Sequence, residues 1–196
     1  MGTFKHPFQE DPEKPPVLQP PQPFTQGLVE VYTGDGKGKT TAAFGVALRA
    51  IGRGLRVHAI LFMKGDADYG EFAVDGLLPN FTIERFGAPG LMDMNNPRPE
   101  DIAEARRALA RAREVLESGT CDILILDEIN VAVSWKLLSV DDVLDLIAKK
   151  PANVELILTG RYAHPKVVEA ADLVTMMRHI KHPYEKGVLA RAGIDY

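Results

Sequence analysis

Residues able to bind phosphate and a divalent metal ion lie in two short segments of the sequence. The first, TGDGKGKTT at residues 33–41, combines three glycines with two lysines. A glycine-rich turn lets backbone amides approach an anion closely, and a lysine ammonium neutralises phosphate oxygens. Lys39 is the candidate for that lysine, and the hydroxyl of Thr40 is the candidate ligand of a magnesium ion. The segment therefore predicts a loop that binds the phosphates of a nucleotide.

This loop is shorter than the usual phosphate-binding motif, G-x-x-x-x-G-K-[ST]. Only three residues separate Gly34 from Gly38, and Thr33 stands where the first glycine of the motif is expected. The alternative is a glycine-rich turn that merely connects a strand to a helix. The G-K-T-T sequence, the apolar run before it and the acidic residues at 127–128 favour phosphate binding.

The second segment, ILILDEI at residues 123–129, is an apolar run that ends in two carboxylates. Carboxylates at the carboxyl end of a parallel strand lie beside the nucleotide crevice, so Asp127 is predicted to hold Mg²⁺ through water. The acidic pair is weak evidence alone, because many surface strands end in acids, but it becomes specific together with the glycine-rich loop. Lys64 and Arg161 also follow apolar runs and are predicted on the same edge, either as ligand contacts or as solvated loop charges.

Six apolar runs are predicted to be the strands that position these residues. Most are rich in leucine and β-branched residues and nearly continuous, which is typical of strands covered on both faces. They occupy residues 28–33, 56–62, 81–87, 121–128, 154–160 and 173–180.

Helical patterns lie between these runs. Residues 100–118 carry an apolar stripe with arginines on the opposite face, and Ser139 with Asp142 is typical of a helix start. The alternation of strands and helices predicts an open, three-layer α/β domain with a mainly parallel sheet, as in P-loop proteins.

Composition excludes several other classes of protein. The 196 residues are 45% apolar and 26% charged with a formal net charge of −4, which disfavours a protein built to coat nucleic acid. No run is long and apolar enough to span a membrane, and the start of the chain lacks the pattern of a secretory signal. We therefore expect a cytoplasmic protein without membrane partners. The single cysteine, Cys121, is expected to be a small buried group.

The domain organisation predicted from the sequence has two parts. Residues 1–26 hold seven of the 14 prolines and are expected to form an extended or disordered arm, because proline blocks helix interiors and removes amide donors. Residues 27–196 are expected to form the single folded domain.

The sequence resembles the corrinoid adenosyltransferases of the P-loop, RecA-like type, which adenosylate cobyrinic acid a,c-diamide and cobalamin. The resemblance covers about residues 27–196. It rests on TGDGKGKTTAAFGVALRAIGRG, LFMKG, LDEI, LTGR and the terminal IKHPYEKGVLARAGIDY.

The resemblance implies transfer of the 5′-deoxyadenosyl group of ATP to the Co(I) centre of a corrinoid, with release of tripolyphosphate. The short loop would hold ATP reversed relative to ordinary P-loop ATPases. Mg²⁺ or Mn²⁺ would be shared by Thr40 and Asp127, with Lys39, Thr40 and Glu128 as catalytic residues. The implied nucleotide-binding residues are Gly34, Asp35, Gly36, Lys37, Gly38, Lys39, Thr40, Thr41 and Arg161. A homodimer and a flavoprotein reductant are the implied partners.

Two features depart from well-known members of this family. Their charged helical arm is replaced here by the proline-rich segment. Their Phe and Trp pair, which displaces the lower ligand of cobalt, is replaced by FGAPGLMDMNNP at residues 86–97. Phe86, Leu91 and Met92 are the apolar residues predicted to face the corrinoid, and Met94 is a further candidate.

Two other functions remain as alternatives. A P-loop ATPase or kinase would need a full-length loop and a base that activates water or an acceptor. An ATP-dependent regulatory protein would bind nucleotide without turnover and use the proline-rich arm to recruit partners.

Overall fold

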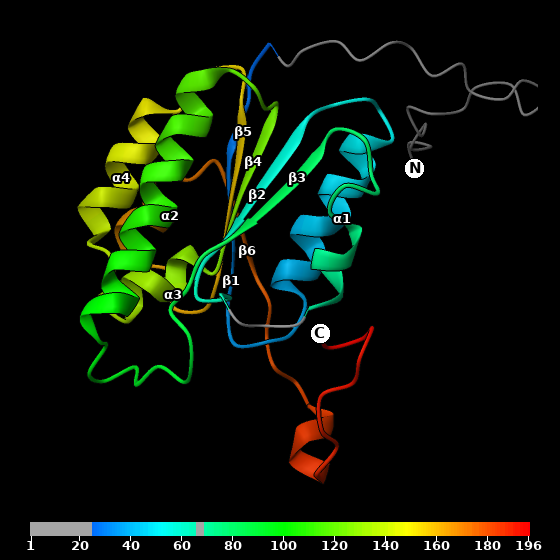
Figure 1. Cartoon of the computed structure of the whole chain (residues 1–196), viewed down its shortest axis with the longest axis vertical. Coiled ribbons are helices and arrows are strands. Elements are labelled where there is room, and N and C mark those ends of the chain that lie inside the picture. The colour runs from blue at the N-terminus through cyan, green and yellow to red at the C-terminus, as the bar shows by residue number, and fades with distance from the viewer. Residues whose placement is uncertain (1–24, 66–68) are drawn as a thin grey trace, which may run out of the picture.

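The structure is a computed structural model that describes residues 25–65 and 69–196 (Figure 1). Residues 1–24, which make up most of the predicted proline-rich arm, lie outside this range. In the described part, six parallel strands form one sheet in the order β3-β2-β4-β5-β1-β6. The strands are β1 (Val29–Thr33), β2 (Val57–Leu61), β3 (Phe81–Arg85), β4 (Ile123–Asp127), β5 (Glu155–Thr159) and β6 (Leu173–Met176).

Helices cover both faces of this sheet (Figure 1). The helix α1 (Lys39–Ile51) packs on one face, and the other α-helices pack on the opposite face. These are α2 (Pro99–Ser118), α3 (Ile129–Ser134), α4 (Val140–Lys149) and α5 (Pro165–Ala170). The described chain also contains two short 3₁₀ helices, η1 (Gly70–Val74) and η2 (Pro183–Lys186). The predicted three-layer α/β fold of the P-loop, RecA-like type is confirmed, and every strand in the described sheet is parallel.

The sheet order explains where the functional segments meet. β1 precedes the glycine-rich loop and β4 ends in the acidic pair, and β5 lies between these two strands. Tyr32 of β1 pairs in register with Thr159 of β5, and Leu126 of β4 pairs with Leu158. The carboxyl ends of all three strands therefore lie side by side on one edge of the sheet.

The predicted helices also form as expected. In α2, Ala105, Leu109, Ala112 and Leu116 are buried in the core against the sheet. In α4, Ser139 accepts a hydrogen bond from the Asp142 amide and Asp142 accepts one from the Ser139 amide, which is a capping box. These contacts fix the helices that cover the face opposite α1.

The expectation that the strands are covered on both faces fails for β3 and β6, the two outermost strands of the sheet. All four residues of β6 are exposed, and burial alternates along β3. Each of these strands has only one neighbour in the described sheet, so apolar composition there does not produce full burial. Cys121 is buried, as predicted. Within the described residues, no helix combines the length and the hydrophobicity that crossing a membrane requires.

Candidate active site

The glycine-rich loop connects the end of β1 to the start of α1, as predicted. Gly34 and Gly38 have φ values of 97° and 116°, which side chains rarely tolerate. A Cβ at Gly34 would also lie 2.3 Å from the carbonyl oxygen of Met177. Gly38 begins α1 and no side chain caps it, so the first amides of the helix point to the loop and favour an anion there.

Lys39 is folded into this loop. Its Nζ donates hydrogen bonds to the carbonyl oxygens of Gly34 at 2.9 Å and Gly36 at 2.7 Å. Burial lowers the pKa of Lys39, and the nearby carboxylate of Glu128 acts in the opposite direction. A phosphate entering the loop would therefore meet a buried ammonium group that is already held in position.

Asp127 is the centre of the polar contacts below the loop and is completely buried. Its Oδ1 accepts hydrogen bonds from the hydroxyl of Thr40 at 2.8 Å and from the hydroxyl of Thr159 at 2.6 Å. Its Oδ2 lies 2.9 Å from Nζ of Lys64. The two residues predicted to hold the metal ion, Thr40 and Asp127, are thus in direct contact.

The oxygen atoms of Thr40 and Asp127 are suitable ligands for a magnesium ion. A hydroxyl and a carboxylate are hard oxygen ligands, which Mg²⁺ prefers. The described residues contain no cluster of three or more His, Cys, Asp or Glu side chains suited to a metal. Mg²⁺ is usually bound by one or two protein groups together with water and substrate phosphates.

Glu128 follows Asp127 and begins α3 with a φ of 65°, a left-handed conformation. Its amide donates to the hydroxyl of Thr159 at 3.0 Å. Burial raises the pKa of the Glu128 carboxyl, and the charge of Asp127 adds to this. A Cβ at Gly160 would lie 3.2 Å from Oε2 of Glu128, so a glycine there leaves room for this carboxylate.

Lys64 lies inside the site and is not a solvated loop charge, which was one of the two alternatives from the sequence. Its side chain is 11% exposed, and its Nζ lies 3.8 Å from Glu71 Oε1 and 4.4 Å from the ring centroid of Tyr69. Burial alone would lower the pKa of Lys64, but the carboxylates of Asp127 and Glu71 raise it overall. Arg161 follows β5 on the same edge and is exposed, as is Thr41.

Thr159 was not identified from the sequence. Its hydroxyl donates to Asp127 and accepts from the Glu128 amide, so it fixes both acidic residues. The only signal in the sequence is its place at the end of an apolar run, directly before Gly160 and Arg161. A threonine at that place is too common to be recognised without the contacts.

Comparison with known proteins assigns the chain to a family. The family model described as "ATP:corrinoid adenosyltransferase BtuR/CobO/CobP" matches residues 25–196. The chain belongs to this family. The resemblance noted in the sequence is confirmed, and the protein is an enzyme of the adenosyltransferase class.

Curated relatives support the assignment over most of their length. A corrinoid adenosyltransferase of Escherichia coli K12 is 36% identical over 171 residues, which cover 87% of this chain and 86% of the relative. One from Pseudomonas aeruginosa is 36% identical over 87% of this chain and 84% of its own length. The corrinoid adenosyltransferase CobA of Salmonella typhimurium is 34% identical over 87% and 86%.

The three apolar residues predicted to face the corrinoid are in different environments in this adenosyltransferase. Phe86 and Met92 are partly buried and pack against the core under α2, and the Arg107 guanidinium lies 5.6 Å from the centroid of the Phe86 ring. Leu91 is 100% exposed. Their role toward a corrinoid stays a prediction.

A cavity of about 230 Å³ lies beside the loop of residues 86–97. It is lined by Met94, Asn95, Pro97, Ser134, Trp135 and Lys136. Trp135, at the end of α3, is the single tryptophan of the chain and was not identified as a site candidate from the sequence. Its position next to Met94 and the loop appears only in the folded chain.

Proposed function

We propose that the protein transfers the 5′-deoxyadenosyl group of ATP to the Co(I) centre of a corrinoid, either cobalamin or cobyrinic acid a,c-diamide. The observation that carries this proposal is the shortened phosphate loop with Lys39 folded into it, in a chain that matches the adenosyltransferase family over residues 25–196. The product side of the reaction is tripolyphosphate.

In this proposal the triphosphate lies in the loop and on the first turn of α1. The amide of Gly36 already donates to Met177, so Gly36 contributes space, whereas the amides that follow it are directed to the phosphates. Asp35 and Arg161 flank the nucleotide. The phosphate-binding residues are Gly34, Gly36, Lys37, Gly38, Lys39, Thr40 and Thr41.

Thr40 and Asp127 would hold Mg²⁺ or Mn²⁺, which supplies neutralising charge for the phosphate oxygens. Lys64 and Thr159 support this position, because each contacts the carboxylate of Asp127. Glu128, in contact with the same threonine, is the second acidic group proposed to act at the site.

The reaction itself needs no base. The Co(I) electron pair attacks C5′ of ATP, a cobalt–carbon bond forms, and the bond between C5′ and the phosphate oxygen breaks. The leaving tripolyphosphate takes the bonding electron pair, and the cobalt becomes formally Co(III). The protein therefore contributes orientation of C5′ toward the corrinoid and stabilisation of the negative leaving group by Lys39 and its neighbours.

A homodimer, a flavoprotein that supplies the reduced corrinoid and a cytoplasmic location complete the proposal. Support for the homodimer comes from β6, an edge strand with Leu173 and Val174 each 40% exposed and Met176 67% exposed. An edge strand of this kind is a template for pairing with another chain. Sedimentation of the purified full-length chain at several concentrations measures its mass and tests this point.

An anaerobic assay with Mg²⁺, ATP and chemically reduced cob(I)alamin tests the reaction. The expected products are adenosylcobalamin, identified by its absorption spectrum, and tripolyphosphate. Orthophosphate without an alkylated corrinoid would identify an ATPase instead. Nucleotide binding without any product under the same conditions would identify a regulatory protein.

A further inference from the structure

The C-terminal tail, residues 177–196, follows β6 beyond the carboxyl ends of the strands (Figure 1). It contacts the phosphate loop directly at both of its ends. The carbonyl of Met177 accepts a hydrogen bond from the Gly36 amide at 2.8 Å. Oδ1 of Asp35 accepts one from the His179 amide at 3.1 Å, and this bond is the main reason that the pKa of Asp35 lies below its ordinary value. The start of the tail is thereby attached to the first half of the loop.

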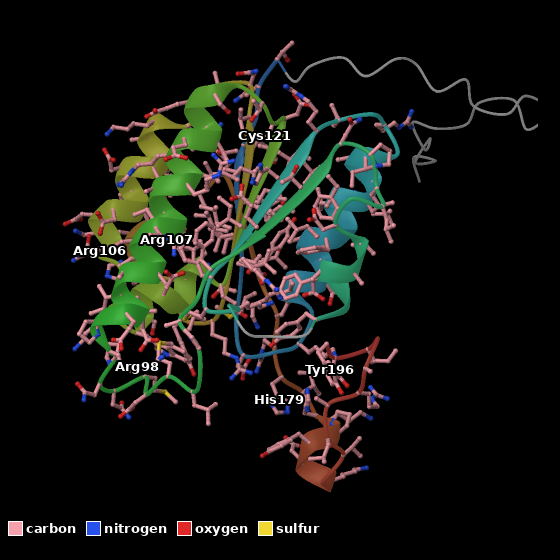
Figure 2. The ribbon with its side chains drawn as sticks, viewed as in Figure 1. Arg98, Arg106, Arg107, Cys121, His179 and Tyr196 are labelled. Atoms are coloured by element: carbon pink, nitrogen blue, oxygen red, sulfur yellow. The ribbon has the colours of Figure 1, made fainter. Side chains whose placement is uncertain are left out.

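The end of the tail returns to the loop at Lys37. Nζ of Lys37 donates to the carbonyl oxygen of Ile194 at 2.8 Å and forms an ion pair with the Asp195 carboxylate. The other oxygen of Asp195 accepts from the amide of Arg191 at 3.0 Å and from its Nε at 3.1 Å. Figure 2 shows His179 and Tyr196 on this tail, beyond the carboxyl ends of the strands.

The two lysines of the loop therefore point to different partners. Lys39 is buried and donates to carbonyl groups inside the loop, whereas the Lys37 side chain is 44% exposed and reaches outward to the tail. The Asp195 side chain is 18% exposed and is held by Arg191. The flexible member of the ion pair is thus Lys37, whose long stem can redirect the ammonium group.

A bound triphosphate would compete with Asp195 for this ammonium group. An exposed ion pair contributes little to stability, and a polyanion seated on the adjacent amides offers several negative charges in place of one carboxylate. When the ammonium group turns from the tail to the triphosphate it leaves Asp195, so binding of the triphosphate and attachment of the tail become reciprocally linked.

We propose that Asp195 is a positioning residue that holds Lys37 on the C-terminal tail, and that the triphosphate of the bound nucleotide takes Lys37 from Asp195 and frees the end of the tail. The proposal rests on the proposed seat of the triphosphate in this loop. It links the nucleotide to a segment that lies at the same edge of the sheet as the site.

Calorimetric titration of the full-length chain with inorganic tripolyphosphate and Mg²⁺ tests the competition. Replacing Asp195 by Asn should tighten binding about threefold, as expected for the loss of one exposed ion pair. In a chain that already carries Lys37→Met, adding Asp195→Asn should change nothing. Glu117→Gln is the matched control, because it removes the same charge at the end of α2, at the opposite edge of the sheet.

Hydrogen exchange of the tail provides a second readout. Tripolyphosphate should accelerate exchange of residues 187–196, whose amides include those of Gly193 and Asp195, bonded within the tail. In Asp195→Asn the same amides should exchange quickly before any ligand is added. Unchanged affinity in Asp195→Asn, an equal gain in the Lys37→Met background, or slower tail exchange with ligand would each overturn the proposal.

One further variant separates this inference from the function on which it rests. Lys39→Ala should abolish tripolyphosphate binding if the loop is its seat. If Lys39→Ala binds normally, the seat of the triphosphate is wrong and the competition falls with it. If Lys39→Ala fails to bind while Asp195→Asn behaves like the unmodified chain, the seat is correct and only the role of Asp195 is wrong.

Discussion

Asp127 is completely buried and its carboxylate contacts Thr40, Thr159 and Lys64, whereas Leu91, on the loop after β3, is completely exposed. The two residues represent the nucleotide side and the proposed corrinoid side of the same edge of the sheet. On the nucleotide side, the side chains of Lys39, Thr40 and Asp127 are held by neighbouring groups. On the corrinoid side, residues 86–97 include both core-packed and solvent-facing apolar groups. In the proposed function, this difference means that the contacts to the nucleotide are prearranged by the fold, whereas the contacts to the corrinoid come from a loop with both buried and exposed apolar groups.

Removing the ammonium group inside the loop is the strongest test of the organised side. Lys39→Ala should slow product formation by roughly a hundredfold, equivalent to about 3 kcal/mol of lost transition-state stabilisation. Initial rates of adenosylcobalamin formation measure this effect. Lys149→Ala, which removes an exposed lysine at the end of α4, is the control and should be nearly silent. Near-normal turnover in Lys39→Ala would contradict the assignment of the loop.

Lys64→Met tests whether the organised side depends on charge compensation. It removes the cation facing Oδ2 of Asp127 and leaves a buried carboxylate, so the free energy of unfolding should fall by about 3 kcal/mol. Chemical denaturation measures the change. The double variant Lys64→Met with Asp127→Asn should recover part of the loss, since no buried charge then remains. A fully additive double variant would show that Lys64 and Asp127 are not coupled.

Thr159→Val tests the hydroxyl that lies between the two acidic residues. The substitution keeps the shape but removes a donor to Asp127 and an acceptor for the Glu128 amide, so about 1–2 kcal/mol of stability should be lost. Thr159→Ser keeps the hydroxyl and is the control. The same denaturation experiment separates them, and equal behaviour of Val and Ser would show that the hydroxyl contributes no stability.

The nucleotide side could be predicted from the sequence because it depends on local chemistry. A positive φ at Gly34 and Gly38 demands glycine, and an acid at the end of an apolar run marks the edge where ligands bind. The six strands were likewise recognisable, because continuous apolar runs between helical patterns are typical of the strands of a parallel sheet. Each of these features can be recognised within a few neighbouring residues of the sequence.

Contacts between distant segments could not be predicted in this way. The ion pairs of Lys64 with Asp127 and of Lys37 with Asp195 join residues far apart in the chain, and each partner alone resembles an ordinary surface charge. The exposure of β6 was missed for a related reason. Its apolar composition is that of a buried strand, and only the order of the strands makes it the outermost strand of the sheet.

Glu155, at the amino end of β5, provides a pH-dependent comparison with the site at the carboxyl ends of the strands. Burial and the neighbouring Glu30 raise the pKa of Glu155 from 4.5 to about 7. The folded chain therefore binds this proton more tightly than the unfolded chain, and the contribution of Glu155 to stability declines as the pH rises from about 4.5 to about 7. Glu155→Gln should flatten this part of the curve of unfolding free energy against pH. Glu117→Gln should leave it unchanged, and an unaltered decline in Glu155→Gln would assign the titration elsewhere.

Leu91 gives the smallest expected effect on stability and the sharpest test of the corrinoid side. Because its side chain is already in solvent, Leu91→Ser should change the free energy of unfolding by less than about 0.5 kcal/mol. If Leu91 contacts the corrinoid as predicted, the KM for cob(I)alamin should rise several-fold while the KM for ATP stays constant. Phe86→Leu is the comparison variant: Phe86 packs against the core, so its replacement should lower stability as well. Equal KM values in Leu91→Ser and the unmodified chain would remove Leu91 from the corrinoid side and leave Met94 and Trp135, which line the neighbouring cavity, as the apolar groups to test next.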